Sequence, residues 1–135
     1  AFVSTALLNS NVMAKLIFII DDSTTMLMSI RSTLEMSGFQ VEAFNNPVQA
    51  VQKLESVKPD LIITDINMPQ MTGLELIGKV RSGSKNRFTP ILALTTESQA
   101  QKRDETKRLG ATGWLVKPVS PPDLTRVLRQ IIPGA

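Results

Sequence analysis

The chain has 135 residues, a formal net charge of +3 and 42% hydrophobic residues, which is the composition of one folded domain. It contains no cysteine and no histidine, so disulfide frameworks, thiolate catalysis, Ser-His-Asp triads and imidazole metal sites are excluded. With five Phe, one Trp and no Tyr, it has no aromatic platform among its basic residues, so we expect no nucleic-acid binding. No apolar run approaches the roughly 18 residues that span a bilayer, so we expect no membrane insertion.

The stretch before Met13, AFVSTALLNSNV, has no basic residue ahead of its short apolar patch, which argues against a signal peptide. We interpret Met13 as the natural start. Residues 1–12 are then an expression-derived or disordered extension, and residues 13–135 form the domain.

The first expected strand is LIFII at 16–20, a run that is apolar throughout and suits burial on both faces of a parallel sheet. Ser23 can cap a helix that ends near Ser37, with Gly38 as its stop. The inward face of this helix would carry Met26, Leu27, Ile30 and Leu34. VEAF at 41–44 contains a charge, which suits a strand at the sheet edge.

Asn46 and Pro47 open the second expected helix. Its inward residues would be Val48, Val51 and Leu54. The run LIIT at 61–64 predicts a second fully buried strand, and this strand runs directly into Asp65. A third helix is expected over 73–80, where Leu74, Ile77 and Val80 recur at helical spacing.

The runs ILAL at 91–94 and WLV at 114–116 complete the strands, and both are expected to be buried on both faces. Between them, ESQAQKRDETKRLGA at 97–111 offers only Ala100 and Leu109 as apolar contacts, so this helix should pack weakly and be prone to motion. The last helix is capped by Ser120 and has Pro121 in its first turn. Its apolar stripe comprises Leu124, Val127, Leu128, Ile131 and Ile132.

Strands and helices alternate along the whole chain, which indicates an α/β domain with a doubly wound, five-stranded parallel sheet and right-handed crossovers. A strand order of 2-1-3-4-5 would put the charged strand at an edge. In such sheets ligands bind at the carboxyl ends of the strands, beside the point where the strand order reverses.

Each of the four apolar strands is followed at once by polar residues able to do chemistry: Asp21 and Asp22, Asp65, Thr95, and Lys117. The carboxyl ends of parallel strands lie at the same edge of a sheet, so these residues should lie together at that edge, which we call the rim. Three carboxylates there raise one another's pKa values unless a cation lies among them. Oxygen ligands suit Mg²⁺, or Mn²⁺, better than zinc. A lysine and a hydroxyl beside the ion are the groups expected around a phosphoryl group in transfer.

Four segments together resemble a response regulator receiver domain of the single-domain, chemotaxis (CheY-like) type. They are IIDDS, PDLIITDINMPQMTGLELI, ILALTTE and GATGWLVKPVSPPDL, and the resemblance covers about residues 15–132. It implies a flavodoxin-like fold and a phosphorylated signalling domain of two-component systems. Such a domain is not an enzyme in the usual sense, although it carries intrinsic autophosphorylation and autodephosphorylation.

The resemblance implies that Asp65 is the phosphoacceptor and a nucleophile toward a phosphohistidine or a small phosphodonor. It implies that Asp22 and Asp65 bind Mg²⁺ directly, Asp21 partly through water, and Asn67 through its backbone carbonyl. Lys117 would pair with the phosphoryl oxygens, and the bond from Lys117 to Pro118 is expected to be cis.

The resemblance also implies that Thr95 moves to bond the phosphoryl group and that Trp114 follows it inward as a switch. A single Trp on a short strand also fits a simple packing role. Thr96 stands where the family usually has a smaller residue, so its bulk is expected to slow phosphodonor entry. Asn67 and Glu97 occupy positions that tune autodephosphorylation, and their pairing predicts a short-lived phosphoryl group.

The implied partners are a chemotaxis-type sensor histidine kinase, a phosphatase, and a downstream target, all in the cytoplasm. The target is expected to dock on the helices at 97–111 and 120–132 and the strand at 114–116, where Lys102, Arg103 and Lys107 favour an acidic partner. Since the sequence ends soon after Ile132, signalling is expected to pass through this surface. Two alternatives stay open: a phosphate sink for a kinase, and a haloacid dehalogenase-like phosphotransferase. The latter needs a second Asp where Asn67 stands.

Overall fold

The computed structural model describes residues 14–96 and 100–132, and in these ranges it forms one parallel sheet. The strands are β1 (Leu16–Ile20), β2 (Gln40–Phe44), β3 (Leu61–Asp65), β4 (Ile91–Thr95) and β5 (Gly113–Val116). Their order is β2-β1-β3-β4-β5, and every neighbouring pair is parallel. The predicted fold class and strand order are confirmed. The proposed extension at 1–12 lies outside the described residues.

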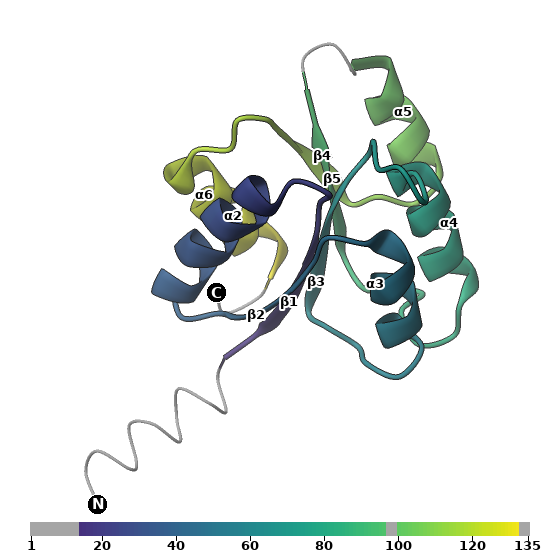
Figure 1. Cartoon of the computed structure of the whole chain (residues 1–135), viewed down its shortest axis with the longest axis horizontal. Coiled ribbons are helices and arrows are strands. Elements are labelled where there is room, and N and C mark those ends of the chain that lie inside the picture. The colour runs from purple at the N-terminus through teal and green to yellow at the C-terminus, as the bar shows by residue number, and fades with distance from the viewer. Residues whose placement is uncertain (1–13, 97–99, 133–135) are drawn as a thin grey trace, which may run out of the picture.

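Helices cover both faces of the sheet (Figure 1). On one face lie α2 (Thr24–Met36) and α6 (Pro121–Ile131), and on the other lie α3 (Pro47–Leu54), α4 (Gly73–Ser82) and α5 (Ala100–Arg108). Three caps follow the prediction, because the side chains of Ser23, Asn46 and Ser120 accept hydrogen bonds from the first turns of α2, α3 and α6. No helix in the described ranges is long and apolar enough to cross a membrane.

The sheet separates two apolar cores, and alternation along β1 explains why its sequence is apolar throughout. Ile17 and Ile19 belong to the core under α2 and α6. Phe18 and Ile20 point to the opposite face and join the core under α3 and α4. All four side chains are almost fully buried. The central strands therefore hold the carboxyl-end rim on a rigid, close-packed base.

Three expectations about buried faces were wrong. Val48 is exposed, while Leu54 is buried and Val51 packs against the core as expected; Pro47 and Ala50 are buried on the same face of α3. The run WLV does not form a fully buried strand, since β5 lies at the second edge of the sheet and leaves Trp114 41% exposed. Among the side chains of α5 from Gln101 to Arg108, the buried one is Thr106, while the expected anchor Leu109, just after the helix, is exposed. The side chain of the other expected contact, Ala100, lies outside the described part of the chain.

Candidate functional site

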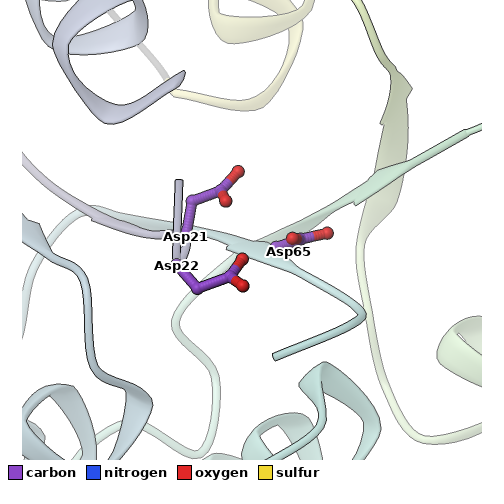
Figure 2. A group of neighbouring side chains, drawn as sticks. All are labelled: Asp21, Asp22 and Asp65. Carbon is purple, nitrogen blue, oxygen red and sulfur yellow. The ribbon is translucent and has the colours of Figure 1, made fainter. Parts of the chain in front are cut away.

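Three carboxylates meet at the carboxyl ends of β1 and β3, as the sequence predicted (Figure 2). Asp21 and Asp22 come from the loop after β1, and Asp65 is the last residue of β3. One oxygen from each lies within 4.8 Å of the others. Asp21 and Asp65 are buried and Asp22 is exposed. The cluster is thus anchored in the core and open to solvent on one side.

Lys117 lies among the acids. Its Nζ atom is 3.0 Å from Asp21 Oδ2 and 3.2 Å from Asp65 Oδ2, so one ammonium group bridges two strand ends. The Lys117 backbone N–H donates to the Thr95 carbonyl at 2.7 Å, which ties the lysine to the end of β4. The peptide bond from Lys117 to Pro118 is cis, which confirms the expectation for that bond.

The charges in the cluster shift one another's pKa values. Burial raises the pKa of Asp65, and the negative charge of Asp21 raises it further, although Lys117 and the backbone N–H of Ile66 oppose both. Burial lowers the pKa of Lys117, but its contacts with Asp21 and Asp65 outweigh this and leave the pKa above its ordinary value. Lys117 therefore stays charged at neutral pH, while the net effect on Asp65 is a pKa above its ordinary value.

Thr95 is fully buried at the end of β4, and its hydroxyl is directed toward α5 and β5. The hydroxyl donates to the Leu115 carbonyl at 3.4 Å and accepts from Arg103 Nε at the same distance. The guanidinium carbon of Arg103 also lies 5.9 Å from the ring centroid of Trp114. Thr96, the next residue, is half-buried, and Glu97 lies outside the described residues.

Asn67 is exposed on the loop after β3, and its Oδ1 atom accepts from Lys102 Nζ at 3.2 Å. Lys102 and Arg103, which are expected to favour an acidic partner, both reach back from α5 to Asn67 and Thr95. A shallow cavity of about 300 Å³ opens beside Asn67 and Asp22 and is also lined by Met68, Pro69 and Thr72. This cavity leads to the exposed side of the carboxylate cluster.

The donor set fits a hard divalent cation. The cluster offers only oxygen ligands, and the buried Oδ2 atom of Asp21 accepts no directed hydrogen bond in the described ranges, although Lys117 lies nearby. A cation beside these atoms would offset the repulsion that raises the Asp65 pKa. Asp21, Asp22 and Asp65 are therefore the residues that could hold Mg²⁺.

Gly73, at the start of α4, is a site-supporting residue that sequence reasoning missed. Its backbone N–H donates to the Ile66 carbonyl at 2.7 Å. A Cβ atom at this position would collide with the Asp65 carbonyl oxygen and lie 2.8 Å from the Ile66 Cα atom. Only glycine lets α4 approach the backbone of Asp65 so closely. The sequence signal is a glycine directly after the capping residue Thr72.

We expect Gly73→Ala to lower the free energy of unfolding by about 1–3 kcal/mol, because the added methyl group must push the Asp65 loop away. Gly78→Ala is the matched control in the same helix, where a Cβ atom would meet nothing within 4 Å. It should instead stabilise the fold by about 0.5–1 kcal/mol. Urea unfolding of both variants checks this, and equal effects of the two substitutions would contradict the close approach at Gly73.

Comparison with known proteins assigns the family. The model for the response regulator receiver domain matches residues 17–129. The chain belongs to the response regulator receiver domain family. The chemotaxis protein CheY1 of Helicobacter pylori is 35% identical to it over 118 residues, covering 86% of this chain and 95% of CheY1.

Solved receiver structures share the fold. The chemotaxis response regulator CheY4 of Vibrio cholerae superposes with a TM-score of 0.84 at 40% identity, covering 89% of this chain and all of CheY4. The receiver domain of the sensor histidine kinase PA1611 from Pseudomonas aeruginosa, which has a magnesium ion coordinated in its active site cleft, superposes with a TM-score of 0.81. It is 25% identical and covers 87% of this chain and 97% of that one. Receiver domains are parts of two-component signalling systems, and the carboxylate cluster here is compatible with the metal binding expected of one.

Proposed function

We propose that this receiver domain accepts a phosphoryl group on Asp65 in a Mg²⁺-dependent reaction and then signals by docking on another protein. The observation that carries the proposal is the contact of one ammonium group, that of Lys117, with two buried carboxylates, those of Asp21 and Asp65. Such a site can hold a metal ion on its exposed side and a phosphoryl group beside the lysine. The donor of the phosphoryl group would be a histidine kinase, and the transfer would take place in the cytoplasm.

Asp65 would act as the nucleophile. Its carboxylate attacks the phosphorus atom of a phosphohistidine or a small acyl phosphate, a new P–O bond forms, and the bond to the leaving group breaks. With phosphohistidine, the departing imidazole takes up a proton from solvent. Ile66 N–H holds Asp65 Oδ1 at 2.8 Å and fixes the direction of the carboxylate. The Lys117 ammonium group can then exchange its contact with the Asp65 carboxylate for a contact with the negatively charged phosphoryl oxygens.

Asp21, Asp22 and Asp65 would hold the Mg²⁺, with the Asn67 backbone carbonyl as a further ligand. When bound, the ion would neutralise the acids and draw charge from the phosphoryl oxygens. The magnesium in the cleft of the PA1611 receiver domain supports this assignment by similarity. Thr95 and Trp114 would act as the switch pair. Asn67, Thr96 and Glu97 would set the lifetime of the phosphoryl group.

A chemotaxis role is proposed on the similarity to CheY1 and CheY4, both at modest identity. The family membership favours a receiver function over a haloacid dehalogenase-like phosphotransferase. The proposed target would dock on α5, β5 and α6, while a phosphatase would reach the open side of the site. Equal binding of the target with and without a beryllofluoride mimic would favour a phosphate sink over a messenger.

Labelling with acetyl phosphate tests the proposal. We expect the intact chain to gain one phosphoryl group in Mg²⁺, and Asp65→Asn to gain almost none. Asp60→Asn is a matched control, since Asp60 lies at the opposite end of β3 and serves to accept the Leu16 N–H at 2.8 Å. It should label like the natural sequence. Undiminished labelling of Asp65→Asn by intact-mass spectrometry would overturn the assignment.

A further inference from the structure

Arg103 on α5 contacts both residues of the proposed switch. Its Nε atom lies 3.4 Å from the fully buried Thr95 hydroxyl, and its guanidinium carbon lies 5.9 Å from the centroid of the Trp114 ring. The second contact is within the range of a cation–π interaction. One planar group therefore touches a hydroxyl at the end of β4 and an aromatic ring on β5.

Strand register explains how one side chain can reach both residues. Thr95 pairs with Val116, and Ala93 pairs with Trp114. Residues two apart on a strand share a face, so Thr95 and Trp114 lie on the same face of the sheet. This is the face that α5 covers (Figure 1). Arg103 lies between α5 and that face, where it is half-buried.

We infer that Arg103 is a positioning residue that couples the Thr95 hydroxyl to the Trp114 ring. The inference rests on the proposed function, because it concerns what happens when Thr95 turns toward a phosphoryl group on Asp65. In the structure, the hydroxyl makes two contacts, with the Leu115 carbonyl and with Arg103 Nε, and both are 3.4 Å long. Contacts of this length are weak, so exchanging them for a bond to a charged phosphoryl oxygen is favourable.

The guanidinium group cannot easily keep both of its contacts during that exchange. Its N–H groups are fixed in one plane, so following the hydroxyl moves the whole plane relative to the indole ring. A phosphoryl group on Asp65 also adds negative charge that attracts the guanidinium toward the rim. Phosphorylation would therefore move the Arg103 guanidinium relative to the Trp114 ring. This movement would change the exposure of the ring and so alter the β5 part of the proposed docking surface.

Tryptophan fluorescence tests this inference directly, because the chain has one Trp and no Tyr and its emission reports on Trp114 alone. We expect saturating beryllofluoride with Mg²⁺ to change the emission of the natural sequence. In Arg103→Leu the change should fall to less than half. Arg103→Lys should show the same loss, since it keeps the charge but not the planar group. Arg108→Leu, an exposed arginine on the same helix, is the control and should respond fully.

Bound beryllofluoride is measured separately by ¹⁹F NMR, and each emission change is divided by the bound fraction. A full emission change in Arg103→Leu with the mimic bound would overturn the role of Arg103 alone. Restoration of the full change by Arg103→Lys would overturn the requirement for a planar group. No bound signal in the natural sequence would overturn the proposed function and this inference together.

Discussion

Lys117→Met is expected to slow phosphorylation by acetyl phosphate by about 10²–10³-fold, the usual loss when one charge-stabilising donor is removed from a transfer site. Lys117 contacts Asp21 and Asp65 at 3.0 and 3.2 Å, and its side chain is only 18% exposed. Methionine keeps much of the length of the lysine side chain but supplies no positive charge to the phosphoryl oxygens in the transition state.

The defect should grow as the pH falls. Lys117 lowers the pKa of Asp65, so its removal lets that pKa rise further. A protonated Asp65 cannot attack phosphorus, and the variant therefore loses its nucleophile at a higher pH than the natural sequence does.

Rates of acyl phosphate formation at several pH values measure both effects. Lys107→Met removes an exposed lysine from α5 and serves as the control. A Lys117→Met rate within a few-fold of the control would contradict a role for this ammonium group in the transfer.

Asp65→Asn should unfold at a higher urea concentration than the natural sequence in the presence of a chelator at pH 7. Burial and the charge of Asp21 raise the pKa of Asp65, so the folded chain holds that proton more tightly than the unfolded chain does. Ionised Asp65 therefore destabilises the fold at neutral pH. Removing the charge while Lys117 keeps Asp21 as its partner should stabilise the fold by about 1–2 kcal/mol.

The raised pKa of Asp65 also determines how the free energy of unfolding changes with pH. The contribution of Asp65 to stability is fully present below its unfolded pKa and is lost as the pH rises through its raised folded pKa. The advantage of Asp65→Asn should thus shrink on acidification. It should also shrink on addition of Mg²⁺, which would stabilise the natural sequence preferentially.

Asp104→Asn is the control for this comparison, because Asp104 is an exposed acid on α5. It should change stability by no more than about 0.5 kcal/mol. If Asp65→Asn were less stable than the natural sequence in chelator, electrostatic strain at the carboxylate cluster would be the wrong explanation.

The carboxylate cluster was predictable because it depends on topology. Apolar strands that end on Asp21, Asp65 and Thr95 can meet at one rim only if the sheet is parallel, and the alternation of strands and helices indicates such a sheet. The sequence pattern also predicted the caps and the order of the strands. The role of Asp65 as the phosphoacceptor stays a prediction.

Other features depend on tertiary contacts that have no periodic signal. The strand containing Trp114 is apolar throughout, and the predicted strand order already places it at an edge, but the composition of the strand does not show that Trp114 is left 41% exposed there. Cations on a helix read as a solvated face, yet Lys102 and Arg103 reach back to Asn67 and Thr95. The contact of Gly73 with the Asp65 backbone depends on how closely α4 approaches β3, which no sequence spacing records.

The central claim is that the Asp65 carboxylate carries the phosphoryl group, and reductive trapping tests it most directly. The chain is treated with acetyl phosphate and Mg²⁺, reduced with borohydride, and digested for peptide mass spectrometry. An aspartyl phosphate is converted to homoserine, so we predict homoserine at position 65 and unchanged Asp at positions 21 and 22. Homoserine at either of those positions with intact Asp65, or phosphate retained on a hydroxyl side chain, would contradict the claim.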